Sequence, residues 1–120
     1  LGFPTVSGIY GLGLAATKYL ELSAGDIAEY VLGLGDYLRE RIDGAKGARL
    51  AYDFPRKNCS GIQVLCINEE NDVTGEKLLQ AGIGAGVKLG RTPGTQEMRI
   101  ALHYYNNQED INRLIDVIGK

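Results

Sequence analysis

The spacing of the apolar residues changes at Gly47, and this change limits the folds that the chain can adopt. Before Gly47, apolar residues recur with the period of an amphipathic helix, first over 6–22 and again over 27–42. After Gly47 the period becomes two over 48–54 and over 61–67, which is typical of strands. We therefore expect two helices followed by a sheet.

The second half of the chain predicts one more helix between strands. Asp72 or Thr74 is expected to cap a short helix that ends at about Ala81, because either side chain can accept a hydrogen bond from a backbone N–H. The spacing then returns to two over 87–89 and over 97–103, which predicts a third and a fourth strand.

Residues that favour helix ends delimit the longer helices. Ser23 is expected to cap the second helix and Gly44 to end it. Asn106 is expected to cap the last helix, with Glu109 completing a variant of the capping box. The residues of this helix that should face the core are Ile111, Leu114, Ile115 and Ile118.

The predicted order of elements is α-α-β-β-α-β-β-α. The predicted fold class is α+β, with an antiparallel or mixed four-stranded sheet and helices on one face. A chain of 120 residues has the size of one ordinary domain, so we expect a single domain over 1–120.

Three glycines interrupt the first helix. Gly8, Gly11 and Gly13 each cost the helix about 1 kcal/mol relative to alanine, so we expect another backbone to approach this helix closely. The segment GLGLAA at 11–16 matches a dinucleotide-binding fingerprint, but such a fingerprint must follow a strand and open a helix. Helix packing is therefore the better interpretation.

Composition excludes several classes of function. The net charge is -2 with no basic stripe, which argues against nucleic-acid binding, and no apolar run approaches the roughly 20 residues that span a membrane. Cys59 and Cys66 lie too far apart along a strand for a disulfide, so reduced thiols in a cytoplasmic protein are expected. A single histidine and no paired cysteines argue against a metal site.

Arg99 is the strongest candidate for a binding residue. If the strand is regular, Arg99 and His103 leave one face, while Met98, Ile100 and Leu102 leave the other. The guanidinium pairs bidentately with a carboxylate or phosphate, which predicts an anion site. A salt bridge within the protein and plain exposure on an uncovered sheet face are the alternatives.

The neighbouring residues add no complete catalytic set. His103 could act as an acid or base, although a histidine beside two tyrosines is more often packed. Lys88 and Arg91 could line the same anion site, and a surface position is the alternative for both. From the residues alone, no catalytic residue is assigned.

Three segments in order carry a resemblance to a known family. The run RIALHYYNN at 99–107 resembles the C-terminal signature of class V aminotransferases, the fold-type I pyridoxal-phosphate enzymes that include cysteine desulfurases and isopenicillin N epimerase-like proteins. The segment GFPTVSGIYGLGLAA at 2–16 and the SGI at 60–62 are also similar to that group. The signature continues in Glu109, Asp110, Ile111, Arg113 and Leu114.

The resemblance implies that the chain is the C-terminal small domain of a longer enzyme and is inactive alone. It implies that Arg99 binds the α-carboxylate of an amino-acid substrate and that His103 has a packing or supporting role. The catalytic lysine would lie in a large domain of the same chain, so pyridoxal phosphate is expected in the full-length enzyme and not on this fragment. The helix over 1–22 would pack on the large domain or on the partner of a homodimer.

Two departures narrow the expected reaction. Phe3 stands where many relatives have a Thr or Ser that reaches the cofactor phosphate of the partner subunit, which puts that contact in doubt. The segment 90–97 is short and lacks the cysteine of the desulfurases, which leaves an aminotransferase, a lyase or an epimerase. The alternatives from other classes are a stand-alone amino-acid-binding regulatory domain and a structural dimerisation domain.

Overall fold

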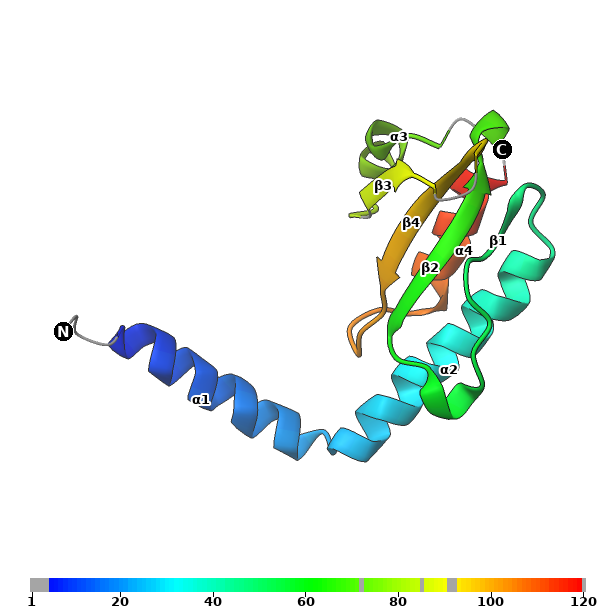
Figure 1. The fold of residues 1–120 in the computed structure, drawn as a ribbon. Coiled ribbons are helices and arrows are strands. Elements are labelled where there is room, and N and C mark those ends of the chain that lie inside the picture. The colour runs from blue at the N-terminus through cyan, green and yellow to red at the C-terminus, as the bar shows by residue number, and fades with distance from the viewer. Residues whose placement is uncertain (1–4, 72, 85, 91–92, 120) are drawn as a thin grey trace.

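The computed structural model describes residues 5–71, 73–84, 86–90 and 93–119. It confirms the α+β class (Figure 1). The helices are α1 (Val6–Glu21), α2 (Ala24–Asp43), α3 (Gly75–Gln80) and α4 (Gln108–Ile118), with short 3-10 turns η1 (Arg56–Asn58) and η2 (Glu69–Asn71). The strands are β1 (Ala48–Leu50), β2 (Ile62–Asn68), β3 (Gly86–Leu89) and β4 (Thr95–Ala101).

The strands form one sheet in the order β1-β2-β4-β3, in which each neighbouring pair is antiparallel. Leu65 of β2 lies opposite Met98 of β4, and both side chains are fully buried. Figure 1 shows α2 and α4 on one side of the sheet. The core lies between these helices and the sheet. It consists of Leu34, Leu38, Ile42, Leu65, Ile67, Val73, Leu78, Met98, Leu102, Ile111, Leu114, Ile115 and Ile118.

The first strand is shorter than predicted. It ends at Leu50, whereas the spacing predicted a strand to residue 54. After Ala51, whose N–H still donates to Val64 at 2.8 Å, the chain continues to a loop that charged side chains hold against α2. Arg56 donates to Glu29 at 3.0 Å and to Asp36 at 2.9 Å, and these hydrogen bonds raise the pKa of Arg56 above its ordinary value.

The fourth strand is predicted to end at His103, but in the structure it ends two residues earlier. β4 runs from Thr95 to Ala101, after which the backbone N–H of Leu102 donates to Gly61 at 2.7 Å. The chain then turns, because the N–H of Asn106 donates to the carbonyl of His103 at 3.0 Å. The prediction of a regular strand that extends to His103 was therefore wrong.

The cap of α4 lies one residue beyond the predicted one. Asn107 accepts hydrogen bonds from the backbone of Glu109 and Asp110, and the Asp110 carboxylate accepts one from the Asn107 N–H. This capping box replaces the expected pair of Asn106 and Glu109. Asn106 instead accepts a hydrogen bond from the His103 N–H at 2.9 Å, which commits its side chain to the preceding turn.

The other predicted helix ends are mixed in outcome. Thr74 caps α3 by accepting a hydrogen bond from the Lys77 N–H at 3.2 Å, and Gly44 ends α2. Asp72 lies outside the described residues. Ser23 precedes α2 but makes no side-chain capping bond, since its backbone has the left-handed φ of 62° at the bend between α1 and α2.

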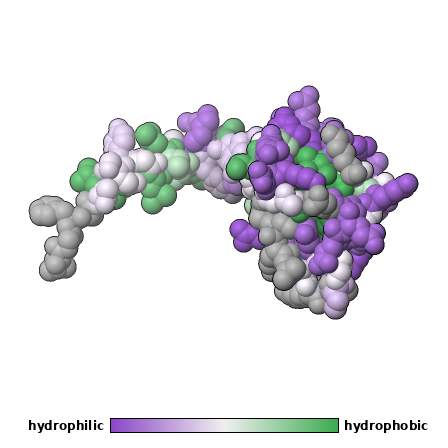
Figure 2. Space-filling view, turned by 90° about the horizontal axis from the view of Figure 1, so that it is seen from above, coloured by the Kyte–Doolittle hydropathy of each residue, from purple (hydrophilic) through white to green (hydrophobic). Residues whose placement is uncertain are grey.

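Helix α1 projects from the rest of the molecule, and no residue in it is buried (Figure 1). Large apolar side chains are exposed along it, as Figure 2 shows. No described atom outside the local helix lies within 4 Å of the place that a Cβ would take at Gly11 or Gly13. The backbone that should approach these glycines is therefore not in the described part of this chain.

The capping geometry makes a testable prediction about stability. Asn107→Ala should lower the free energy of unfolding by about 1 kcal/mol, because two N–H groups at the start of α4 lose their acceptor. Chemical denaturation followed by circular dichroism measures this loss. Gln108→Ala, at the exposed first position of α4, is the matched control and should change stability little. Equal effects of the two substitutions would contradict the assignment of the cap.

Candidate functional site

Arg99 lies on the face of the sheet opposite α2 and α4. Its neighbours along β4 show the alternation, because Met98 is fully buried on the helix side while Arg99 is exposed. In the register of the sheet, Arg99 is flanked by Val64 of β2 and by Gly86 of β3. Because Gly86 has no side chain, it places none beside Arg99 on that flank.

The guanidinium of Arg99 is not engaged within the described part of the chain. None of the described residues accepts a hydrogen bond from it or forms an ion pair with it. The predicted alternative of an internal salt bridge therefore finds no support among these residues. The side chains of Lys88 and Arg91, which were expected near Arg99, lie outside the description.

The predicted pairing of Arg99 with His103 depended on a regular strand, and β4 ends between them. The His103 ring is exposed at the turn after β4 and stacks on Tyr105, with ring centroids 4.8 Å apart and planes 18° apart. It also contacts Tyr104 at 4.6 Å. These contacts agree with a packing role. The described residues contain no cluster that would hold a metal ion.

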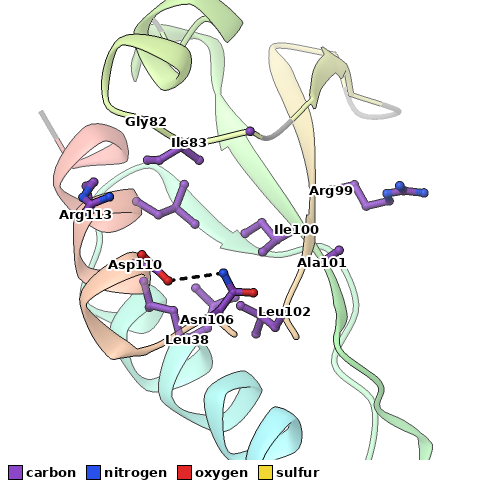
Figure 3. Close-up of a pocket in the computed structure, with 13 residues that line it drawn as sticks. Leu38, Gly82, Ile83, Arg99, Ile100, Ala101, Leu102, Asn106, Asp110 and Arg113 are labelled. Atoms are coloured by element: carbon purple, nitrogen blue, oxygen red, sulfur yellow. Dashed lines mark hydrogen bonds between the residues drawn. The ribbon is translucent and has the colours of Figure 1, made fainter. Parts of the chain in front are cut away.

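A pocket of about 480 Å³ opens on the helix side of β4, where the turn after α3 meets the first half of α4 (Figure 3). Figure 3 shows the Arg99 side chain pointing away from this pocket, although the residue contributes to its wall. The apolar lining residues are Leu38, Ile83, Ile100, Leu102, Ile111 and Leu114, and the polar ones are Asn106, Asp110 and Arg113. The pocket and the guanidinium therefore belong to different faces of the sheet.

No motif or spacing in the sequence predicted this pocket. Its wall combines α2 with the turn after α3, β4 and α4, which lie far from α2 in the sequence. To predict the pocket, one would have to know which helices and strands lie side by side in the fold.

The structure also brings an arginine to a cysteine. Arg39 of α2 lies 3.7 Å from the sulfur of Cys59 and forms an ion pair with Asp53. Arg39 stands twenty residues before Cys59 in the sequence, so this contact was missed. The thiol lies within hydrogen-bonding distance of the carbonyls of Phe54 and Pro55, so the cysteine helps to hold the loop.

Comparison with known families completes the description of the site. The family model described as aminotransferase class-V matches residues 1–114. No curated relative matches the chain significantly. Since the match covers nearly the whole sequence, the chain belongs to the aminotransferase class-V family, as the motifs at 2–16, 60–62 and 99–107 indicated. Family membership implies pyridoxal phosphate and amino-acid substrates for the full-length enzymes.

The described pocket does not fit this cofactor. Its lining is mainly apolar, and Arg113, a cation that could attract a phosphate, shares the wall with the Asp110 carboxylate, which would repel one. These residues therefore provide no contact for the cofactor.

In the described part of the chain, none of the helices has the length and apolar character that crossing a membrane requires.

The environments of the two thiols predict different reactivity. Both cysteines are free, but Cys66 is 7% exposed whereas Cys59 is half-buried at the loop. Iodoacetamide should therefore modify Cys59 faster than Cys66 in the native protein, and denaturation should remove the difference. Mass spectrometry of the labelled peptides measures both rates. Equal native rates would mean that Cys66 is not packed in the sheet as described.

Proposed function

We propose that this chain is the C-terminal small domain of a pyridoxal-phosphate enzyme and that Arg99 binds the α-carboxylate of its amino-acid substrate. The observation that carries the proposal is an exposed arginine without a described partner, beside a glycine, on the sheet face that α2 and α4 leave open. The family match supplies the substrate class.

The chemistry of the guanidinium suits this role. Arginine presents two parallel N–H donors that match the two oxygens of a carboxylate, and it stays charged at any physiological pH. A carboxylate held at both oxygens cannot rotate, so the Cα of the substrate is oriented for reaction. The cofactor supplies the carbanion chemistry in enzymes of this kind, and the protein orients the substrate.

The chain is expected to be inactive alone. The family match supports a large domain of the same polypeptide that would supply the catalytic lysine and hold pyridoxal phosphate. The short connection before β4 lacks a cysteine, which favours an aminotransferase, lyase or epimerase over a desulfurase. The two free thiols are consistent with a cytoplasmic enzyme.

The role of Arg99 predicts a specific loss in the full-length enzyme. Arg99→Ala should raise the KM for L-alanine or L-cysteine, whichever the wild type uses better, by about 10- to 100-fold. The reason is that a charge-assisted hydrogen bond contributes roughly 1.5–3 kcal/mol. The KM of Arg99→Lys should lie between those of the wild type and Arg99→Ala, since lysine keeps the positive charge but lacks the two parallel N–H donors of the guanidinium. Binding of ethylamine or cysteamine, which lack the carboxylate, should not change.

Arg49→Ala is the matched control for this experiment. Arg49 is an exposed arginine on β1, placed by the register opposite Cys66 on the same sheet face, two strands away from β4. Its removal should leave KM near the wild-type value. Unchanged kinetics in Arg99→Ala, or equal effects of both substitutions, would exclude the proposed carboxylate site.

We propose further that α1 packs on the large domain or on the partner of a homodimer. Large apolar side chains gathered on an exposed helix mark a contact surface, and α1 has a set of such residues that are each 60% or more exposed: Val6, Ile9, Tyr10, Leu12, Leu14 and Leu20. Close approach of another backbone would also explain its glycines.

A glycine substitution tests the packing of α1. Gly11→Leu should lower the thermal midpoint of the full-length protein, because overpacking costs about 1–3 kcal/mol where another backbone is close. Gly33→Leu is the control, since Gly33 is exposed on α2 and no described atom crowds it. It should keep or raise the midpoint. A rise for Gly11→Leu as well would mean that α1 is uncovered.

The alternative of a stand-alone amino-acid-binding domain has less support. Its ligand would need the arginine and an enclosing pocket together, but the Arg99 side chain points away from the described pocket. The pocket lining is mainly apolar, which suits a zwitterion poorly.

A further inference from the structure

The corner between β4 and α4 is held by hydrogen bonds that converge on Asn106. We use the name β4–α4 corner for residues 102–107. The Asn106 side chain accepts from the His103 N–H at 2.9 Å and its amide lies 3.4 Å from the Asp110 carboxylate (Figure 3). Asn106 therefore ties the end of the arginine strand to the start of α4.

A tyrosine from a distant helix completes this set of bonds. The hydroxyl of Tyr30 donates to the backbone carbonyl of Asn106 at 2.8 Å, across 76 residues of sequence. Tyr30 lies in the first two turns of α2, ahead of the α2 residues Leu34, Leu38 and Ile42 that enter the core cluster. Its hydroxyl thus fastens the projecting start of α2 to the corner.

The β4–α4 corner is also closely packed where its first residue, Leu102, meets Gly61. The N–H of Leu102 donates to Gly61, and a Cβ at Gly61 would lie 2.3 Å from the Leu102 carbonyl and 2.8 Å from Val31. Gly61, just before β2, is therefore packed between the end of β4 and Val31 of α2. A shift of α2 at this point would be passed to the corner.

We propose that Tyr30 is a positioning residue for Arg99. This inference rests on the proposed function of Arg99 as the carboxylate-binding residue. The sheet places Arg99 relative to β2 and β3, but the substrate must meet it at a site shared with the large domain. The Tyr30 hydroxyl ties the β4–α4 corner, which follows the strand that bears Arg99, to the start of α2, only a few residues after the Ser23 bend that joins α2 to α1.

The physical reason is that binding of a carboxylate by a fork of donors depends on distance and angle. Small displacements of a binding group weaken the interaction and cost affinity. If α1 packs on the large domain, α2 and Tyr30 form a rigid route from that domain to the end of β4. Loss of the hydroxyl would leave β4 intact in the sheet but less closely fixed relative to the large domain.

Tyr30→Phe in the full-length enzyme tests the proposal. It should raise KM for L-alanine or L-cysteine about 2- to 10-fold, the range given by a net hydrogen-bond contribution of roughly 0.5–1.5 kcal/mol, with little change in kcat. Binding of ethylamine or cysteamine should not change. Hydrogen exchange of the peptide over 99–107 should become faster, which is a readout independent of activity.

Tyr37→Phe is the matched control on the same helix. The Tyr37 hydroxyl lies 2.9 Å from the side-chain oxygen of Asn112 in the middle of α4, away from the corner. Its loss removes a comparable bond between α2 and α4, so a general effect on stability should appear in both variants. A rise in KM should appear only in Tyr30→Phe.

A double-mutant cycle decides whether Tyr30 acts through Arg99. In an Arg99→Ala background, Tyr30→Phe should cause no further rise in KM, because the group that it positions is gone. A Tyr30→Phe enzyme with unchanged KM, or an equal rise in both backgrounds, overturns the positioning role while the proposed function stands. If Arg99→Ala itself leaves KM unchanged, both proposals fail.

Discussion

The pairing of β2 with β4 is the interaction on which the rest of the structure depends. It runs from Ile62 opposite Ala101 to Asn68 opposite Thr95, with Leu65 and Met98 buried at its centre. Because side chains alternate along a strand, this register decides which residues face α2 and α4. A slip of β4 by one residue would turn Arg99 toward the core and Met98 toward solvent. The apolar core thus sets the direction of the arginine.

This alternation places the pocket and the Arg99 guanidinium on opposite faces of the sheet, so they do not form one site. The apolar pocket lies on the covered side of β4, and the guanidinium lies on the open side (Figure 3). A substrate carboxylate bound by Arg99 would therefore approach from the face without helices. The unburied α1 has the same implication, because its apolar surface and the open sheet face both lack a covering layer within the described chain.

Helix α2 connects these features. Its C-terminal half contributes Leu34, Leu38 and Ile42 to the core, while its start carries Glu29 and Tyr30, which fasten the η1 loop and the β4–α4 corner. The helix is thus both a layer of the domain and a link from α1 to the end of the arginine strand. The ion pairs of the η1 loop are exposed, so their contribution is to hold the loop in place rather than to stability.

The sequence by itself determined the α+β class, the positions of the main elements, the family and the choice of Arg99 as a candidate, because periodicity and motifs are local. It did not distinguish Asn106 from Asn107 as the cap of α4, since adjacent asparagines have the same propensity. The end of β1 at Leu50, the end of β4 at Ala101, the pocket and the bond from Tyr30 to Asn106 were decided only by the tertiary structure. Each depends on contacts between segments far apart in the chain, which no local pattern records.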